Sequence, residues 1–151
     1  IERLVKLREV FGKKFVIRID ANQGYTTQQT IDFFHRTKSL DIELIEQPLP
    51  AKAVEEMKQL PEIIREKIAA DESLITPQQA LELVMAPRAS GIFNIKLMKC
   101  GGVSQALKIA DIGKQAGVDL FWGCNDESIV SITAALHTAF SCAHTKYIDL
   151  D

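Results

Sequence analysis

Short apolar runs alternate along the chain with longer segments whose apolar residues recur at helical spacing. The short runs have strand length and are rich in β-branched or aromatic residues, and they cover residues 15–19, 42–45, 67–70, 92–95, 118–122 and 146–148. The chain opens in a helical pattern, and later helices are predicted to begin at Thr26 or Thr27, at Thr76 with Pro77, at Ser104 and at Ser128. Because no hairpin signal separates the strands, the alternation predicts parallel strands joined by crossover helices.

An ionisable residue follows nearly every predicted strand. Asp20, Glu46, Asp71 and Lys96 stand at intervals of 25 or 26 residues, and Asp149 follows the last strand. In a (β/α)8 barrel the carboxyl ends of the strands converge on the face where active sites are built, so these residues would lie side by side. Six strands cannot close such a barrel. The sequence therefore predicts an α/β fold that is the later part of a barrel, with two strands missing upstream, and an open doubly wound sheet is the alternative.

The three acids suggest a metal site. Carboxylate oxygens are the hard ligands that Mg²⁺ prefers, and a cation would relieve the repulsion between Asp20, Glu46 and Asp71. No cluster of histidines accompanies them, which argues against zinc. Lys96 would lie beside the acids and can serve as a general acid or base, whereas Lys99 is expected at the surface.

Composition narrows the class of protein. The 151 residues fit one domain, and 46% hydrophobic with 25% charged residues is typical of a soluble globular protein. A net charge of −2 and the absence of a long apolar run predict neither a nucleic-acid partner nor a membrane partner. The three cysteines lack metal-binding spacing and indicate reduced thiols, which favours a cytoplasmic location. Both ends of the sequence look cut.

Five motifs in order carry a resemblance to a known family. They are "DANQGY" from Asp20, "IEQPLP" from Ile45, "ADES" from Ala70, "NIKLMKCGG" from Asn94 and "GCNDES" from Gly123. Together they resemble the enolase superfamily in its muconate-lactonizing subgroup, most closely the dipeptide epimerases of the L-Ala-D/L-Glu type. The resemblance implies a TIM-like (β/α)7β barrel, of which this chain would hold only the later six or so βα units. The first strands and the N-terminal capping domain would be absent.

The resemblance also implies roles for individual residues. One Mg²⁺ per site would be bound by Asp20, Glu46 and Asp71, and Lys96 would be the acid or base on one face of the substrate. Asn22 and Glu72 would orient the metal ligands or Lys96. Residues expected to contact the substrate are Asp149 and Asp151, which would bind its α-ammonium group, and Cys124 and Asn125, which would line the pocket.

The implied reaction is the Mg²⁺-dependent epimerisation of a small dipeptide, with Ala-Glu as the leading candidate. The proton next to the C-terminal carboxylate would be removed through an ene-diolate intermediate. The family's second catalytic lysine lies on a strand before Ile1, and Lys6, Lys13 and Lys14 do not replace it, so the chain alone is not expected to racemise. Association into a homo-oligomer is left open.

Two alternatives remain. The first is another enzyme of the subgroup, such as an o-succinylbenzoate synthase, an N-acylamino-acid racemase or a muconate cycloisomerase. Their substrates lack a free α-ammonium group, so Asp149 and Asp151 favour the dipeptide. The second is a non-catalytic barrel fragment, whose unpaired edge strands would make it insoluble or dimeric.

Overall fold

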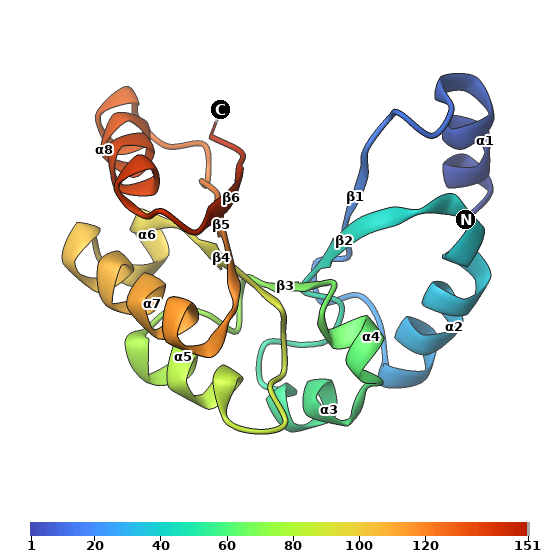
Figure 1. Ribbon diagram of the computed structural model, residues 1–151, viewed down its shortest axis with the longest axis horizontal. Coiled ribbons are helices and arrows are strands. Elements are labelled where there is room, and N and C mark those ends of the chain that lie inside the picture. The colour runs from blue at the N-terminus through green and yellow to red at the C-terminus, as the bar shows by residue number, and fades with distance from the viewer. Residues whose placement is uncertain (151) are drawn as a thin grey trace.

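Six parallel strands form one curled sheet in residues 1–150, the part of the chain that this computed structural model describes (Figure 1). The strands are β1 Ile17–Asp20, β2 Ile42–Glu46, β3 Ile68–Ala70, β4 Ile92–Ile95, β5 Asp119–Trp122 and β6 Thr145–Ile148. Each strand pairs with the next one along the chain. A doubly wound sheet would reverse its strand order at a switch point, so the order supports an open segment of a barrel and excludes the alternative.

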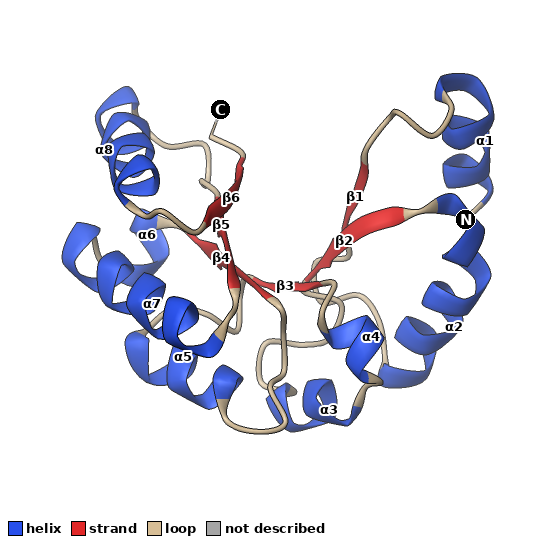
Figure 2. Cartoon of the chain, in the orientation of Figure 1, coloured by secondary structure: helices blue, strands red, loops and turns tan. Residues whose placement is uncertain are grey.

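Helices cover the outer, convex side of this sheet, and β1 and β6 lie at its two ends (Figure 2). The helices are α1 Glu2–Phe11, α2 Thr27–Thr37, α3 Val54–Gln59, α4 Glu62–Arg65, α5 Pro77–Val84, α6 Leu97–Cys100, α7 Val103–Ala116 and α8 Ile129–Ser141, with a 3₁₀ turn at Lys38–Leu40. None of the helices in the described residues has the length and apolar character needed to span a bilayer. The predicted partial α/β barrel is confirmed.

The starts of α2, α5 and α8 follow from local sequence. Thr76 and, of the two predicted alternatives Thr26 and Thr27, Thr26 each accept a hydrogen bond from the backbone N–H three residues on. Each also forms a capping box with a glutamine. Ser128 caps α8 in the same way without the glutamine. The prediction of Ser104 as a cap is wrong, because α7 begins at Val103 with Gly102 as its N-cap. Gly101 and Gly102 both have positive φ angles, 82° and 108°. The chain turns at these two residues after α6, so α7 begins before the predicted cap at Ser104.

Alternation along the strands separates two buried layers. One layer packs between the sheet and the helices and includes Ile45, Phe93 and Trp122. The other lines the concave side and consists of Leu44, Ala69, Ile92, Phe121 and Tyr147. Burial of a leucine, isoleucine or phenylalanine side chain in these layers stabilises the fold by roughly 1.5–3 kcal/mol. Residues two positions further along a strand face the same side, so the concave layer directs the residues at the strand ends into the barrel mouth.

The first strand is shorter than its apolar run predicts. Pairing between β1 and β2 begins at Ile17 with Ile42, and Phe15 and Val16 lie outside the strand with 43% and 56% of their surface exposed. Hydrophobicity alone therefore misplaced this start, because strand pairing and not side-chain type defines the strand. The carboxyl end of β1 at Asp20 agrees with the prediction to one residue.

Candidate active site

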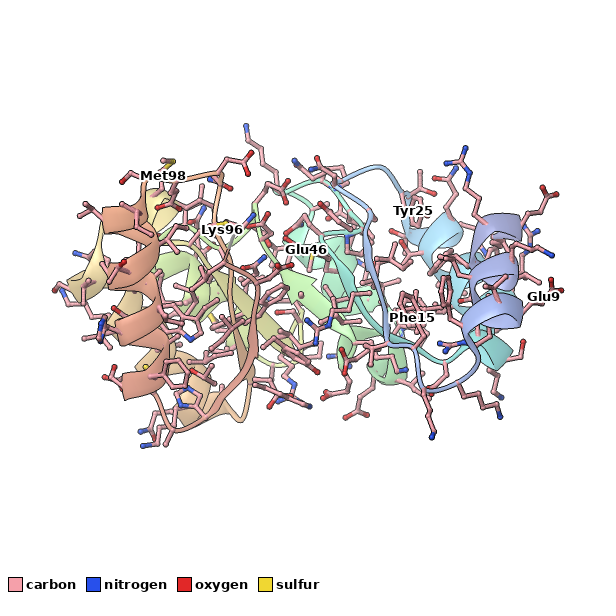
Figure 3. The ribbon with its side chains drawn as sticks, turned by 90° about the horizontal axis from the view of Figure 1, so that it is seen from above. Glu9, Phe15, Tyr25, Glu46, Lys96 and Met98 are labelled. Carbon is pink, nitrogen blue, oxygen red and sulfur yellow. The ribbon has the colours of Figure 1, made fainter. Side chains whose placement is uncertain are left out.

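The predicted site residues lie at the carboxyl ends of four neighbouring strands. Asp20 and Glu46 are the last residues of β1 and β2 and stand opposite each other in the pairing register. Asp71 directly follows β3, and Lys96 directly follows β4. Figure 3 shows Glu46 and Lys96 close together near the centre of the view, between the two flanks of helices. The regular 25-residue spacing in the sequence has become a row along one edge of the sheet.

Lys96 bridges two of the acids. Its Nζ lies 2.9 Å from Asp71 Oδ2 and 3.8 Å from Glu46 Oε1. The three side chains are between 9% and 13% exposed, so these charges interact with little screening by solvent. The structure therefore brings a lysine and two acids into direct contact, as the strand-end pattern predicts.

Lys99 makes the second contact with Asp71, and the prediction that it lies at the surface is wrong. Its Nζ donates to Asp71 Oδ1 and, at 2.7 Å, to the backbone carbonyl of Asp71, with a longer bond of 3.2 Å to the carbonyl of Asn94. Its side chain is 12% exposed. Lys99 lies on the short helix α6, whose N-cap is Lys96, and this three-residue spacing brings both ammonium groups onto Asp71.

The charges in this cluster shift one another's pKa values. Burial, followed by repulsion from Asp71, raises the pKa of Glu46 to about 7. Burial also acts to raise the pKa of Asp71, but the Lys99 and Lys96 ammonium groups outweigh it and hold that pKa below its ordinary value. Burial opposes the ammonium form of Lys96, yet Asp71, Glu46 and Glu72 outweigh burial and raise its pKa. For Lys99 burial prevails, and its pKa is lowered.

Asp20 and Asn22 occupy the exposed edge of the cluster. Asp20 Oδ1 accepts a hydrogen bond of 2.8 Å from the backbone N–H of Asn22, which has a positive φ of 42°. This turn ends β1 and fixes the carboxylate at the strand end. The Asn22 contact comes from the backbone, so a role for its side chain stays a prediction.

Glu72 lies next to Asp71 and is half-buried. Its Oε2 is buried and has no hydrogen-bond partner within the described residues. Its charge contributes to the raised pKa of Lys96, so the two side chains interact electrostatically. This arrangement agrees with a role beside Lys96, and the role itself stays a prediction.

The donor set has the chemistry that suits Mg²⁺. No group of three or more His, Cys, Asp or Glu side chains within residues 1–150 is gathered closely enough to hold a metal ion. Two ammonium groups occupy both oxygens of Asp71, and the Asn94 amide bonds Glu46 Oε1. Burial, followed by repulsion from Asp71, raises the pKa of Glu46, and a divalent cation would relieve that repulsion. The ligand assignment stays a prediction.

Three of the four predicted substrate residues, Cys124, Asn125 and Asp149, lie further along the same edge of the sheet. Asp149 follows β6 and is exposed, and its backbone N–H donates to the Trp122 carbonyl at 2.9 Å. Asp151 lies outside the described residues. Cys124 is half-buried and Asn125 is exposed in the loop between β5 and α8. The contacts of these four residues with a substrate stay predictions.

Two buried polar residues that the sequence did not single out support the cluster. Gln47 is fully buried, and its Oε1 accepts hydrogen bonds from the backbone N–H of Asp71, the backbone N–H of Ser73 and the Ser73 hydroxyl. Asn94 is 2% exposed and donates to Glu46 Oε1 at 2.7 Å. Glutamine and asparagine carry no charge signal, so only the position of Gln47 directly after Glu46 and the alternation of Asn94 with Lys96 could have pointed to them.

Comparisons of sequence and of structure with known proteins lead to the same family. The sequence model of the family described as "Enolase C-terminal domain-like" matches residues 1–150. The L-Lys-D/L-Arg epimerase of Desulforapulum autotrophicum is 54% identical over the whole chain, and the L-Ala-D/L-Glu epimerase of Clostridium acetobutylicum is 39% identical over the whole chain. The crystal structure of a dipeptide epimerase from Methylococcus capsulatus, complexed with Mg and the dipeptide L-Arg-D-Lys, matches 99% of the chain with a TM-score of 0.96 and 50% identity.

The chain spans 42% of the length of each of these three proteins. Its whole length is therefore matched, while more than half of each relative has no counterpart in it.

Proposed function

This chain belongs to the enolase C-terminal domain-like family, in agreement with the resemblance carried by its motifs, and from that premise we propose that the protein containing it is a Mg²⁺-dependent dipeptide epimerase. The observation that carries the proposal is 54% identity over the whole chain to a protein named L-Lys-D/L-Arg epimerase. The activity is proposed for the complete protein, because the chain covers 42% of that relative. A cytoplasmic location is part of the same proposal.

Asp20, Glu46 and Asp71 would hold the metal. All three offer carboxylate oxygens from neighbouring strand ends, and Mg²⁺ is commonly bound by one or two carboxylates together with substrate and water. When bound, the cation would supply positive charge that stabilises the negative charge developing on the substrate carboxylate. Burial and repulsion from Asp71 raise the pKa of Glu46 to about 7, and this supports the assignment, since a cation would relieve the repulsion.

Lys96 would move the proton. Its Nζ is tethered by Asp71 at 2.9 Å and points along the edge shared with Glu46. In the present arrangement the neighbouring acids raise its pKa and hold it in the ammonium form, ready to donate. Cancellation of those acidic charges by a cation would lower the pKa, so that the amine becomes able to accept the proton next to the substrate carboxylate. The ene-diolate intermediate would then be reprotonated from the opposite face by a group outside residues 1–150.

The substrate is proposed to be a dipeptide with cationic side chains. The relative at 54% identity is named for Lys and Arg, and the solved structure at 50% identity contains L-Arg-D-Lys, which favours this class over Ala-Glu. Asp149 and Asp151 would bind the α-ammonium group, and Cys124 and Asn125 would line the pocket. This assignment leaves the dipeptide carboxylate at the strand ends that carry Asp71 and Lys96.

The test is hydrogen exchange in D₂O. The complete protein would be incubated with Mg²⁺ and with L-Lys-L-Arg or L-Ala-L-Glu, and the α-proton of the C-terminal residue would be followed by NMR. We expect exchange, appearance of the second diastereomer, and faster turnover of L-Lys-L-Arg. Lys96→Gln should abolish epimerisation, because it removes the titrating amine. The matched control is Lys146→Gln, since Lys146 is exposed and pairs with Asp119 at the start of β5, far along the strands from the site.

Exchange without the second diastereomer would indicate one-faced chemistry and would contradict epimerisation. Turnover of N-acylated amino acids in place of dipeptides would move the assignment to another enzyme of the subgroup. Full activity of Lys96→Gln would remove Lys96 from the mechanism.

A further inference from the structure

Asn94 lies two residues before Lys96 and faces the same side of the sheet. Its Nδ2 donates to Glu46 Oε1 at 2.7 Å, and this is the same oxygen that lies 3.8 Å from Lys96 Nζ. Asn94 is 2% exposed, so its amide is confined by packing. Asn94 therefore fixes the position of the Glu46 oxygen that lies nearest Lys96.

The other half of the Asn94 amide makes no compensating bond. Its Oδ1 is buried and has no hydrogen-bond partner within the described residues. A buried amide oxygen without a donor destabilises the fold. This cost offsets the stabilisation from the bond to Glu46, so stability alone does not explain why asparagine stands at position 94. The oxygen lies instead against the backbone of Gly123.

Gly123, the residue after β5, leaves the space that Asn94 and Lys96 use. A Cβ atom added there would lie 2.6 Å from Asn94 Oδ1, 3.1 Å from Lys96 Cε and 3.2 Å from Asn94 Nδ2. The backbone of Gly123 is held in place, because its N–H donates to the Ile95 carbonyl at 3.1 Å. A side chain at this position would therefore push Asn94 and Lys96 aside, since the glycine backbone cannot retreat.

We propose that Asn94 and Gly123 are positioning residues for the pair formed by Glu46 and Lys96. Asn94 holds the Glu46 carboxylate, and Gly123 keeps open the room in which Asn94 and the stem of Lys96 lie. Neither residue touches substrate in this assignment. The inference rests on the proposed function, because the placement matters only if Glu46 binds the cation and Lys96 moves the proton.

The experiment compares Gly123→Ala, Asn94→Ala and the double variant in the complete protein. The matched control is Gly113→Ala in α7, also buried, where an added Cβ would meet the side chains of Phe93 and Leu120 at 3.2 and 3.3 Å on the helix-covered side of the sheet. Two quantities are measured for each variant. They are the Mg²⁺ affinity by calorimetry without dipeptide, and kcat and KM for α-proton exchange of L-Lys-L-Arg in D₂O.

Gly123→Ala should lower kcat by roughly tenfold to a hundredfold with a KM change below about threefold, because displacement of reacting groups by about 1 Å costs that much. It should also weaken Mg²⁺ binding, while Gly113→Ala leaves both quantities within about twofold, as expected for a site away from the chemistry. In the Asn94→Ala background the loss caused by Gly123→Ala should shrink, since the atom that the new Cβ meets is gone. A merely structural glycine would not show this dependence on Asn94.

An unchanged kcat in Gly123→Ala, or losses that simply add in the double variant, would overturn the inference. Failure of the proposed function looks different, because the wild-type protein itself would then exchange no dipeptide. In that case the Mg²⁺ titration decides, and an unchanged Mg²⁺ affinity in Gly123→Ala overturns the inference. Absence of Mg²⁺ binding by the wild-type protein would overturn both.

Discussion

Gln47 ties the end of β2 to the segment that carries Asp71, and its removal should be costly. Its Oε1 accepts from the Asp71 N–H at 3.0 Å, the Ser73 N–H at 3.2 Å and the Ser73 hydroxyl at 2.9 Å, while its Nε2 donates to the Leu49 carbonyl at 2.9 Å. The residue is fully buried and has a positive φ of 33°. Gln47→Ala would therefore leave buried polar groups after both β2 and β3 without hydrogen-bond partners.

The magnitude follows from the groups left without partners. The Ser73 hydroxyl can rotate to another acceptor, but two backbone N–H groups and the Leu49 carbonyl cannot. At the lower end of about 1–3 kcal/mol for each unsatisfied buried group, the loss in unfolding free energy is about 3 kcal/mol. The emptied volume adds to it. Gln29→Ala is the matched control, because Gln29 also bonds backbone through its Oε1 but in the exposed capping box of α2, where the loss should stay below about 1 kcal/mol.

The assay is unfolding of the complete protein in urea, with the Mg²⁺ affinity measured in parallel. Because the Asp71 N–H loses its anchor, we expect weaker Mg²⁺ binding by Gln47→Ala and unchanged binding by Gln29→Ala. A loss below about 1 kcal/mol in Gln47→Ala would refute the reasoning, since it would mean that water or neighbouring groups satisfy these donors.

Three further predictions concern packing, pH and capping. Gly91→Ala should destabilise the protein by about 3 kcal/mol or more, because the added Cβ would lie 2.4 Å from the Glu66 carbonyl oxygen, a backbone atom that cannot rotate away; thermal unfolding measures this. Mg²⁺ affinity should fall as pH drops through about 7 and level off above it, because burial and Asp71 raise the pKa of Glu46 to about 7 and its proton must leave before a cation binds. Calorimetry in two buffers should detect the released proton. An Mg²⁺ affinity that stays constant from about pH 6 to 8 would contradict this prediction. Thr76→Ala should cost about 1 kcal/mol through loss of the α5 cap, with Ser104→Ala as a control that loses no cap, and equal losses in the two variants would contradict the assignment.

Local features of the site were readable because each depends on a few neighbouring residues. The ends of β1 and β2 at Asp20 and Glu46 follow from where apolar runs stop at a carboxylate. A cap at Thr26 or Thr27 and one at Thr76 were predicted from a hydroxyl residue directly before a helical pattern, and the structure has them at Thr26 and Thr76. The start of α7 was misjudged because the glycine pair before it can take positive φ angles, and sequence alone does not say that it does.

The sequence by itself determined the alternation of strands and helices, the period that aligns acids and Lys96 along one edge, and the family. These follow from hydrophobic periodicity and from motif order, which are properties of the linear chain. Only the tertiary structure decided that Lys99 turns inward onto Asp71, that Asn94 reaches Glu46 across 48 residues, and that Gln47 binds the segment after β3. Such contacts join different strand–helix units, and which polar side chain is buried against which partner depends on strand register and packing. That register exists only once the sheet has formed.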